Sequence, residues 1–215
     1  HDPRVCNAIP LNGFDNVRPS YQMIKALIKA VPDIVIDKEN LMMISPDEGA
    51  MGRCMYYSSV LGIDIGMFYK RRDYSVIING KNPIEAHEYL GQDLTDKDVI
   101  VVDDMISSGG SMLDVAKQMK DRGAARVIVC TTFGLFTDGF AAFDEYYEKG
   151  YIDRVLTTNL TYLPQEALEK PYFIVADMSK ILAIIIESLN HDIGFSNVLN
   201  PTDKIHKLLE KHNKR

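Results

Sequence analysis

The sequence predicts an α/β protein in which a parallel β-sheet is flanked by helices on both faces. Short apolar runs alternate along the chain with longer amphipathic segments. The apolar runs lack the polar alternation of strands that keep one face in water, so these strands are expected to be buried on both faces. Two of the amphipathic segments stop at a glycine, Gly123 and Gly150, as helices commonly do. Buried strands separated by helices are typical of a parallel sheet.

The expected strands are short apolar runs, several of them rich in valine and isoleucine. They cover residues 41–44, 64–69, 98–102, 126–132, 154–158 and 172–175. The expected helices cover residues 21–30, 51–61, 111–122, 140–149, 178–190 and 202–213. The connection between residues 69 and 98 shows little helical pattern, so it is expected to be a long irregular loop. Ligands of such sheets bind beyond the carboxyl ends of the strands, which directs attention to the residues that follow each strand.

The composition excludes several classes of partner. The 215 residues carry a net charge of -6, so the chain has no overall basic field to attract nucleic acid or an acidic membrane. No apolar run approaches the ~20 residues that span a bilayer. The three cysteines have no metal-binding or redox spacing, and their odd number favours a reducing compartment. We therefore expect a cytoplasmic protein with neither nucleic acid nor membrane as a partner, in which Cys54 and Cys130 are packing residues.

The segment from Val99 to Ser111 carries the clearest chemistry. An apolar run leads into Asp103 and Asp104, and a loop of small residues then opens the next expected helix. Paired carboxylates at a strand end suit Mg²⁺ or sugar hydroxyls. Glycine lets the backbone approach a ligand closely, and the free amides and dipole of a helix start attract a phosphate. The alternative is a solvated strand end in which Ser111 caps the helix.

Other phosphate-binding loops are absent from the sequence. The chain contains neither Gly-x-x-x-x-Gly-Lys-Ser/Thr nor Gly-x-Gly-x-x-Gly, which excludes an ordinary P-loop and the dinucleotide-binding fingerprint. The phosphate site is therefore expected at Ser107, Ser108, Gly109, Gly110 and Ser111.

This order of residues resembles the phosphoribosyl-diphosphate loop of the type I phosphoribosyltransferase fold. Three further segments narrow the resemblance to the ribose-phosphate pyrophosphokinases. Residues 45–53 (Ser-Pro-Asp-Glu-Gly-Ala-Met-Gly-Arg) resemble that family's Ser-Pro-Asp-x-Gly-Gly-x-x-Arg. Residues 68–72 (Phe-Tyr-Lys-Arg-Arg) resemble its Lys-Arg-Arg at the root of a mobile catalytic loop, and residues 13–17 resemble the stretch before its second domain. The opening residues 1–3 resemble the tail of its Asp-x-His segment.

The resemblance implies a domain organisation and an assembly. Residues 1–215 form a single phosphoribosyltransferase-like domain, in which residues 1–38 are interpreted as the tail of an N-terminal domain plus a connection and residues 39–190 as the core. The chain begins with His1 rather than methionine, and we interpret this start as an internal cut. The family also implies a homo-oligomer.

The resemblance further implies a reaction, in which the pyrophosphoryl group of MgATP passes to the C1 hydroxyl of ribose 5-phosphate and gives phosphoribosyl diphosphate and AMP. Lys70 and Arg72 would be the catalytic residues, because they neutralise charge on the transferred group. His1 and Asp47 would belong to the metal site together with Asp103. The implied substrate-binding residues for ribose 5-phosphate are Asp103, Asp104, Ser107, Ser108, Gly109, Gly110 and Ser111.

One residue departs from the family pattern. Ser107 stands where the family loop usually begins with Asp, and a serine hydroxyl brings neither charge nor a base near neutral pH. Ser107 keeps open one alternative to the kinase, a catalytically silent homologue that binds or regulates. A second alternative within the same fold is a nucleobase phosphoribosyltransferase, and residues 45–53 and 68–72 argue against it. Three other groups stay open: Arg53 is a surface ion pair or a ligand contact, residues 133–139 are turns or shape a nucleotide pocket, and residues 157–159 are a weaker candidate.

Overall fold

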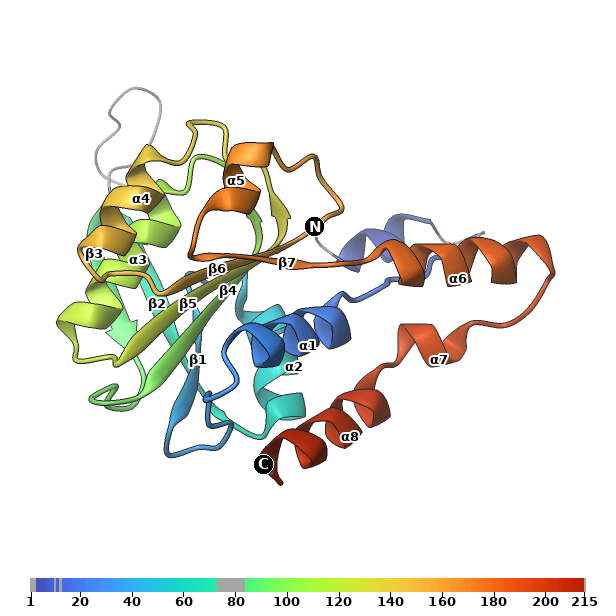
Figure 1. Ribbon diagram of the computed structural model, residues 1–215, viewed down its shortest axis with the longest axis horizontal. Coiled ribbons are helices and arrows are strands. Elements are labelled where there is room, and N and C mark those ends of the chain that lie inside the picture. Colours follow the sequence, from blue (N-terminus) through green and yellow to red (C-terminus); the bar gives the residue numbers. More distant parts are fainter. Residues whose placement is uncertain (1–2, 10, 12, 73–83, 215) are drawn as a thin grey trace.

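The computed structural model describes residues 3–9, 11, 13–72 and 84–214. A seven-stranded sheet forms its centre, in the order β3-β2-β1-β4-β5-β6-β7 (Figure 1). All neighbouring strands run parallel except β2 and β3, which are antiparallel. The strands are β1 (Leu41–Ser45), β2 (Asp64–Arg72), β3 (Ile84–Leu90), β4 (Asp98–Ile106), β5 (Arg126–Gly134), β6 (Arg154–Thr158) and β7 (Phe173–Ala176). The predicted α/β fold with a parallel sheet is confirmed.

Helices cover both faces of this sheet. One face packs against α1 (Ser20–Ala30), α2 (Met51–Leu61) and α8 (Thr202–Asn213). The other packs against α3 (Gly110–Asp121), α4 (Ala141–Glu148) and α5 (Gln165–Glu169). Each face has its own buried apolar cluster, as expected for strands buried on both sides. Because α1 and α8 contribute side chains such as Leu27 and Ile205, the core extends beyond residues 39–190.

Three shorter or outlying helices complete the described chain: η1 (Pro3–Ala8), α6 (Ser179–Asn190) and α7 (Ser196–Leu199). Figure 1 shows α6 extending away from the sheet after β7. Of its twelve residues, all of them described, only Ser188 is buried, whereas Leu182, Ile186 and Leu189 are exposed. Within the described residues, no helix is long and apolar enough to cross a membrane.

The expectation of a long irregular loop after residue 69 is wrong for its last part. Ile84–Leu90 forms β3, an edge strand that pairs antiparallel with β2, and β2 itself continues to Arg72. The ring centroids of Phe68 in β2 and Tyr89 in β3 lie 5.6 Å apart, and this contact adds to the pairing of the two strands. The sequence Ile-Glu-Ala-His-Glu-Tyr-Leu mixes charged and apolar residues, because an edge strand is partly exposed to water and need not be continuously apolar.

Strand β4 is longer than its apolar run. It continues through Asp103 and Asp104 to Ile106, because β5 extends equally far and pairs with it, Met105 opposite Phe133 and Ile106 opposite Gly134. The sequence had placed the two aspartates directly after a strand of residues 98–102. In the structure they lie inside the last part of the strand. Ladder pairing with β5 holds their backbone extended.

The amino end of β4 is fixed by an ion-pair network. Asp98 is 8% exposed and accepts two hydrogen bonds from Arg126, from Nε at 2.8 Å and from Nη2 at 2.6 Å. Arg126 also donates from Nη1 to Asp33 at 2.8 Å. A bidentate arginine of this kind matches the geometry of the carboxylate, so this acid is fully paired.

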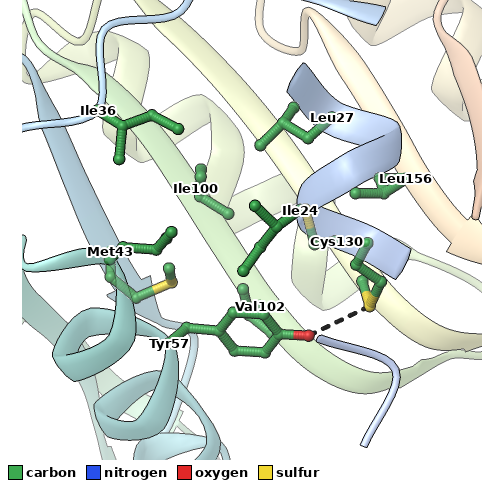
Figure 2. Close-up of a pocket in the computed structure, with 11 residues that line it drawn as sticks. Ile24, Leu27, Ile36, Met43, Tyr57, Ile100, Val102, Cys130 and Leu156 are labelled. Atoms are coloured by element: carbon green, nitrogen blue, oxygen red, sulfur yellow. Dashed lines mark hydrogen bonds between the residues drawn. The ribbon is translucent and has the colours of Figure 1, made fainter. Parts of the chain in front are cut away.

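A small apolar cavity of about 20 Å³ lies between α1, α2 and the sheet (Figure 2). Its lining includes Ile24, Leu27 and Ile100, and the hydroxyl of Tyr57 donates to the sulfur of Met23 at 3.3 Å. Cys130 also lines it, and burial raises the pKa of that thiol. A space of this size and polarity is a packing defect and offers no polar groups to a ligand. Cys130 is thus a packing residue, as predicted.

Candidate functional site

The carboxyl ends of β1 and β4 meet at one edge of the sheet. The two strands are parallel neighbours in which Ile44 lies opposite Val101. The loop that follows β1 carries Asp47 and leads into α2, while β4 continues for five residues past this point to Ile106. The register therefore brings the first acidic loop beside the aspartate pair, although the two segments are more than fifty positions apart in sequence.

Asp103 lies at the centre of this edge. Its Oδ1 accepts a hydrogen bond from the backbone N–H of Asp104 at 2.8 Å and contacts Nη1 of Arg53 at 3.4 Å. Both side chains of the ion pair are largely buried, Arg53 with 23% and Asp103 with 26% of the side chain exposed. The structure shows Arg53 in an ion pair with a candidate site residue, and a ligand contact of Arg53 stays a prediction.

The Asp103 carboxyl is poorly compensated in this position. Burial is the main cause that raises its pKa to about 7, and the neighbouring acids Asp104 and Asp47 raise it further. The backbone hydrogen bond from Asp104 acts in the opposite direction. A carboxyl with such a pKa has too little positive charge around it, and perturbed acids of this kind concentrate at functional sites.

Asp47 is held by the start of α2. Its Oδ1 accepts the backbone N–H of Ala50 at 3.1 Å, and its carbonyl oxygen accepts the hydroxyl of Ser45 at 2.7 Å. These bonds close a turn at the end of β1 and fix the carboxylate near the sheet edge. The acid influences Asp103 through its charge, which agrees with the two lying close together.

Asp103 and Asp47 suit a cation whose other ligands are water and substrate oxygens. No cluster of three or more His, Cys, Asp or Glu side chains in metal-binding geometry occurs within the part of the chain that the structure describes. Mg²⁺ needs no such cluster, because it commonly binds one or two carboxylates together with water and substrate phosphates. Asp103 and Asp47 carry carboxylate oxygens of the type that this ion binds, and their role as metal ligands stays a prediction. His1, the third predicted metal ligand, lies outside the described residues.

The loop after β4 opens an uncapped helix. Gly109 occupies the N-cap position of α3 with φ of +93°, and no side chain makes a capping hydrogen bond there. The alternative in which Ser111 caps the helix is therefore wrong. Ser107, Ser108, Gly110 and Ser111 are exposed, so the first amides of α3 face a solvent-accessible loop. An anion is the natural partner of such a terminus.

An aromatic ring fixes the shape of this loop. A Cβ on Gly109 would lie 2.4 Å from Cζ of Phe143 in α4, so only glycine fits between the loop and the ring. Phe143 is fully buried and packs edge-to-face with Phe136 at 5.3 Å between ring centroids. The sequence did not identify Phe143, and the signal that it offered was the density of phenylalanines between positions 133 and 143.

The segment 133–139 supports the same loop from the side. The backbone N–H of Leu135 donates to the carbonyl oxygen of Ile106 at 2.8 Å, and the backbone N–H of Thr137 donates to the carbonyl oxygen of Ser107 at 3.0 Å. These bonds tie the two loops after β4 and β5 together. The structure therefore gives this segment a supporting role, and its part in a nucleotide pocket stays a prediction.

Two residues of the last candidate segment, 157–159 at the end of β6, make internal hydrogen bonds. Thr158 donates to the carbonyl of Thr132 at 2.6 Å, and the side-chain amide of Asn159 donates to Asp177 at 2.8 Å. Thr157 is fully buried. These contacts join β6 to its neighbours, and a part of this segment in a nucleotide pocket stays a prediction.

Lys70 and Arg72 are placed by their backbone alone. Both belong to β2, where Lys70 lies opposite His87 and Arg72 opposite Ile84, with a register shift between Arg71 and Arg72. Strand β2 pairs with β1 on the side away from β4. Their side chains lie outside the described part of the structure, so their catalytic role stays a prediction.

Comparison with known proteins agrees with this geometry. The model of the phosphoribosyl transferase domain family matches residues 14–158. The ribose-phosphate pyrophosphokinase of Ureaplasma parvum is 31% identical over 143 residues, which is 66% of this chain and 40% of that protein. The enzyme of the same name from Haemophilus influenzae is 30% identical over 187 residues, which is 86% of this chain and 55% of that protein. The resemblance found in the sequence is confirmed.

A solved structure extends the comparison to three dimensions. The phosphoribosylpyrophosphate synthetase from Mycobacterium smegmatis matches with a TM-score of 0.63 at 21% identity, covering 80% of this chain and 51% of that one. At this identity the match confirms the fold alone. The chain spans about half the length of the relatives that it matches.

Proposed function

Since the chain belongs to the phosphoribosyl transferase domain family, we propose that it is the ribose-phosphate-binding part of a ribose-phosphate pyrophosphokinase. The reaction transfers the pyrophosphoryl group of MgATP to the C1 hydroxyl of ribose 5-phosphate and yields phosphoribosyl diphosphate and AMP. The names of the relatives support this reaction over others of the fold. A homo-oligomer and a cytoplasmic location remain part of the proposal.

The observation that carries the proposal is the uncapped start of α3 directly beyond the aspartate pair of β4. The loop from Ser107 to Ser111 would hold the 5-phosphate of the sugar. Its exposed amides and hydroxyls donate to the phosphate oxygens, and the positive end of the helix dipole adds to the attraction. No lysine is required, because donors and dipole together bind an anion.

The carboxylates would hold the other end of the sugar. Asp103 and Asp104 accept hydrogen bonds from the ribose hydroxyls, and Asp103 and Asp47 bind Mg²⁺. A bound Mg²⁺ supplies positive charge that neutralises the phosphate oxygens of ATP. The raised pKa of Asp103, about 7, agrees with a carboxyl that gains from a cation. Lys70 and Arg72 would neutralise the group in transfer.

The test is the release of AMP from ATP that depends on ribose 5-phosphate and Mg²⁺. It uses the chain together with any sequence that its gene encodes on either side. We expect turnover, and we expect its loss when Asp103 and Asp104 are both replaced by Asn. Release of pyrophosphate from phosphoribosyl diphosphate that requires a nucleobase, without AMP formation from ATP, would instead show a nucleobase phosphoribosyltransferase.

A second candidate function rests on Ser107. Its hydroxyl replaces the carboxylate of the family loop, and its carbonyl is already bonded to the N–H of Thr137. A loop of this kind can bind the sugar phosphate without supporting turnover, as in a regulatory homologue. Binding of ribose 5-phosphate by calorimetry without AMP release supports this candidate. Activity that appears in Ser107→Asp would identify the serine as the cause.

A further inference from the structure

The ion pair between Arg53 and Asp103 differs from an ordinary structural ion pair. Only one guanidinium nitrogen, Nη1, approaches the carboxylate, and its distance from Oδ1 is 3.4 Å. The pair between Arg126 and Asp98 in the same sheet is bidentate, with distances of 2.8 Å and 2.6 Å. Because bidentate geometry is the strong form of this contact, Arg53 holds Asp103 loosely.

The contact also leaves half of the carboxylate available. Oδ1 of Asp103 takes both the backbone N–H of Asp104 and Nη1 of Arg53. Within the described residues, Oδ2 accepts no hydrogen bond. Since about a quarter of the Asp103 side chain is exposed (26%), a ligand from solvent can reach it.

The position of Arg53 follows from its helix. It is the third residue of α2, directly after the turn that carries Asp47. The guanidinium is thus placed at the edge where two carboxylates, Asp47 and Asp103, come close together, and it partly balances their charge. A divalent cation bound to the same carboxylates would occupy space next to this guanidinium.

We propose that Arg53 is the internal counter-ion of Asp103 and competes with the divalent cation for this carboxylate. This inference rests on the proposed function, which puts Mg²⁺ on Asp103. Arg53 partly balances the charge of the acidic edge while no cation is bound, and it lowers the affinity for the cation. It is a positioning residue, since it acts through Asp103.

The expected size of the effect follows from electrostatics. A guanidinium and a divalent ion on one carboxylate are separated by roughly 7 Å, and their repulsion corresponds to roughly tenfold in affinity even with the dielectric constant of water. The loss of a loose monodentate contact offsets little of this change. Removal of the guanidinium should therefore strengthen cation binding.

The experiment measures Mn²⁺ binding by electron paramagnetic resonance, with Mn²⁺ in place of Mg²⁺ and without ATP or ribose phosphate. It is carried out at pH 8.5 on the wild type, Arg53→Met, Arg53→Gln and Arg53→Lys. We expect Arg53→Met and Arg53→Gln to bind Mn²⁺ roughly tenfold more tightly. Arg53→Lys keeps the charge and should stay within about twofold of the wild type. Circular dichroism verifies that each variant is folded.

The matched control is Arg122→Met, which removes one positive charge at the end of α3 away from the site. Arg122 is exposed and lies over the ring of Tyr89 at 5.4 Å. Unchanged Mn²⁺ affinity in this control shows that net charge alone does not explain the effect. Equal tightening in Arg122→Met and Arg53→Met would overturn the inference.

Asp103→Asn separates this inference from the proposed function. If Asp103→Asn weakens Mn²⁺ binding while Arg53→Met and Arg53→Gln leave it unchanged or weaker, the inference fails and the metal assignment stands. If Asp103→Asn binds Mn²⁺ as the wild type does, or if no variant binds it, the metal assignment fails and the inference fails with it. AMP release is measured separately and decides the kinase proposal.

Discussion

The two ends of β4 carry acids of opposite character. At the amino end, Asp98 is almost fully buried and accepts two short hydrogen bonds from Arg126, whose pKa the pair raises. At the carboxyl end, Asp103 has a single loose arginine contact, two acidic neighbours and a pKa raised to about 7. A partly buried charge is usually neutralised by its surroundings. The incomplete neutralisation of Asp103 distinguishes the carboxyl end of β4 as the candidate site for a ligand.

Among the substitutions, the largest expected loss of stability comes from breaking the ion pair between Asp98 and Arg126 at the amino end of β4. Asp98→Asn leaves the charge of Arg126 largely uncompensated, because among the described residues only the exposed Asp33 remains as its ion-pair partner. We expect a loss of about 3 kcal/mol in the free energy of unfolding, measured by urea denaturation. Binding of ribose 5-phosphate should be unchanged in the folded variant. A large loss of ligand affinity with normal stability would contradict the structural role of this end.

The two ends of α3 extend the comparison to glycine. Gly109 precedes the helix with φ of +93°, and Gly123 follows it with φ of +89°. A Cβ on Gly109 would clash with the ring of Phe143, and one on Gly123 would lie 3.3 Å from Cα of Thr95. We expect Gly109→Ala and Gly123→Ala each to lower the free energy of unfolding by about 2 kcal/mol, because the added Cβ is strained in a left-handed backbone and crowded by its neighbours.

Ligand binding should distinguish these two variants. Gly109→Ala deforms the loop at the helix start and should abolish binding of ribose 5-phosphate, whereas Gly123→Ala should bind it with unchanged affinity. Calorimetry on the two folded proteins measures the difference. Equal affinities for both variants would show that the start of α3 is not the phosphate site.

A third effect is expected in the pH dependence of stability. The pKa of Asp103 is about 7 in the folded chain against an ordinary 3.8, so the folded state keeps a proton that the unfolded chain releases. The wild type should therefore lose stability relative to Asp103→Asn as the pH rises from about 4 to about 7, with no further change above pH 7. Denaturation at several pH values measures this difference. Asp121→Asn, at the exposed end of α3, serves as the control for the loss of one carboxylate.

The sequence predicted the parts of the site that are local in the chain. The aspartate pair and the loop up to Ser111 are consecutive, so their chemistry could be recognised without knowledge of the fold. The parallel sheet was predictable too, since runs such as Val99–Val102 carry only apolar β-branched residues.

The parts that depend on distant contacts could not be predicted. The approach of Arg53 to Asp103 requires the register between β1 and β4, and the contact of Gly109 with Phe143 requires the packing of α4. Strand β3 was missed because its sequence mixes charged and apolar residues and therefore lacks the apolar run that identifies buried strands. In each case the deciding interaction joins residues that the sequence keeps apart.

The contact between Gly109 and Phe143 has a consequence for how this chain can diverge. A mutation that shrinks the ring leaves the glycine intact, so position 143 can drift to smaller apolar residues at the cost of a cavity. A substitution of Gly109 remains unfavourable even when residue 143 is smaller. The backbone at position 109 is left-handed, and residues with a Cβ are strained in that conformation. We therefore expect glycine at position 109 to be more strongly conserved than phenylalanine at position 143 among distant homologues.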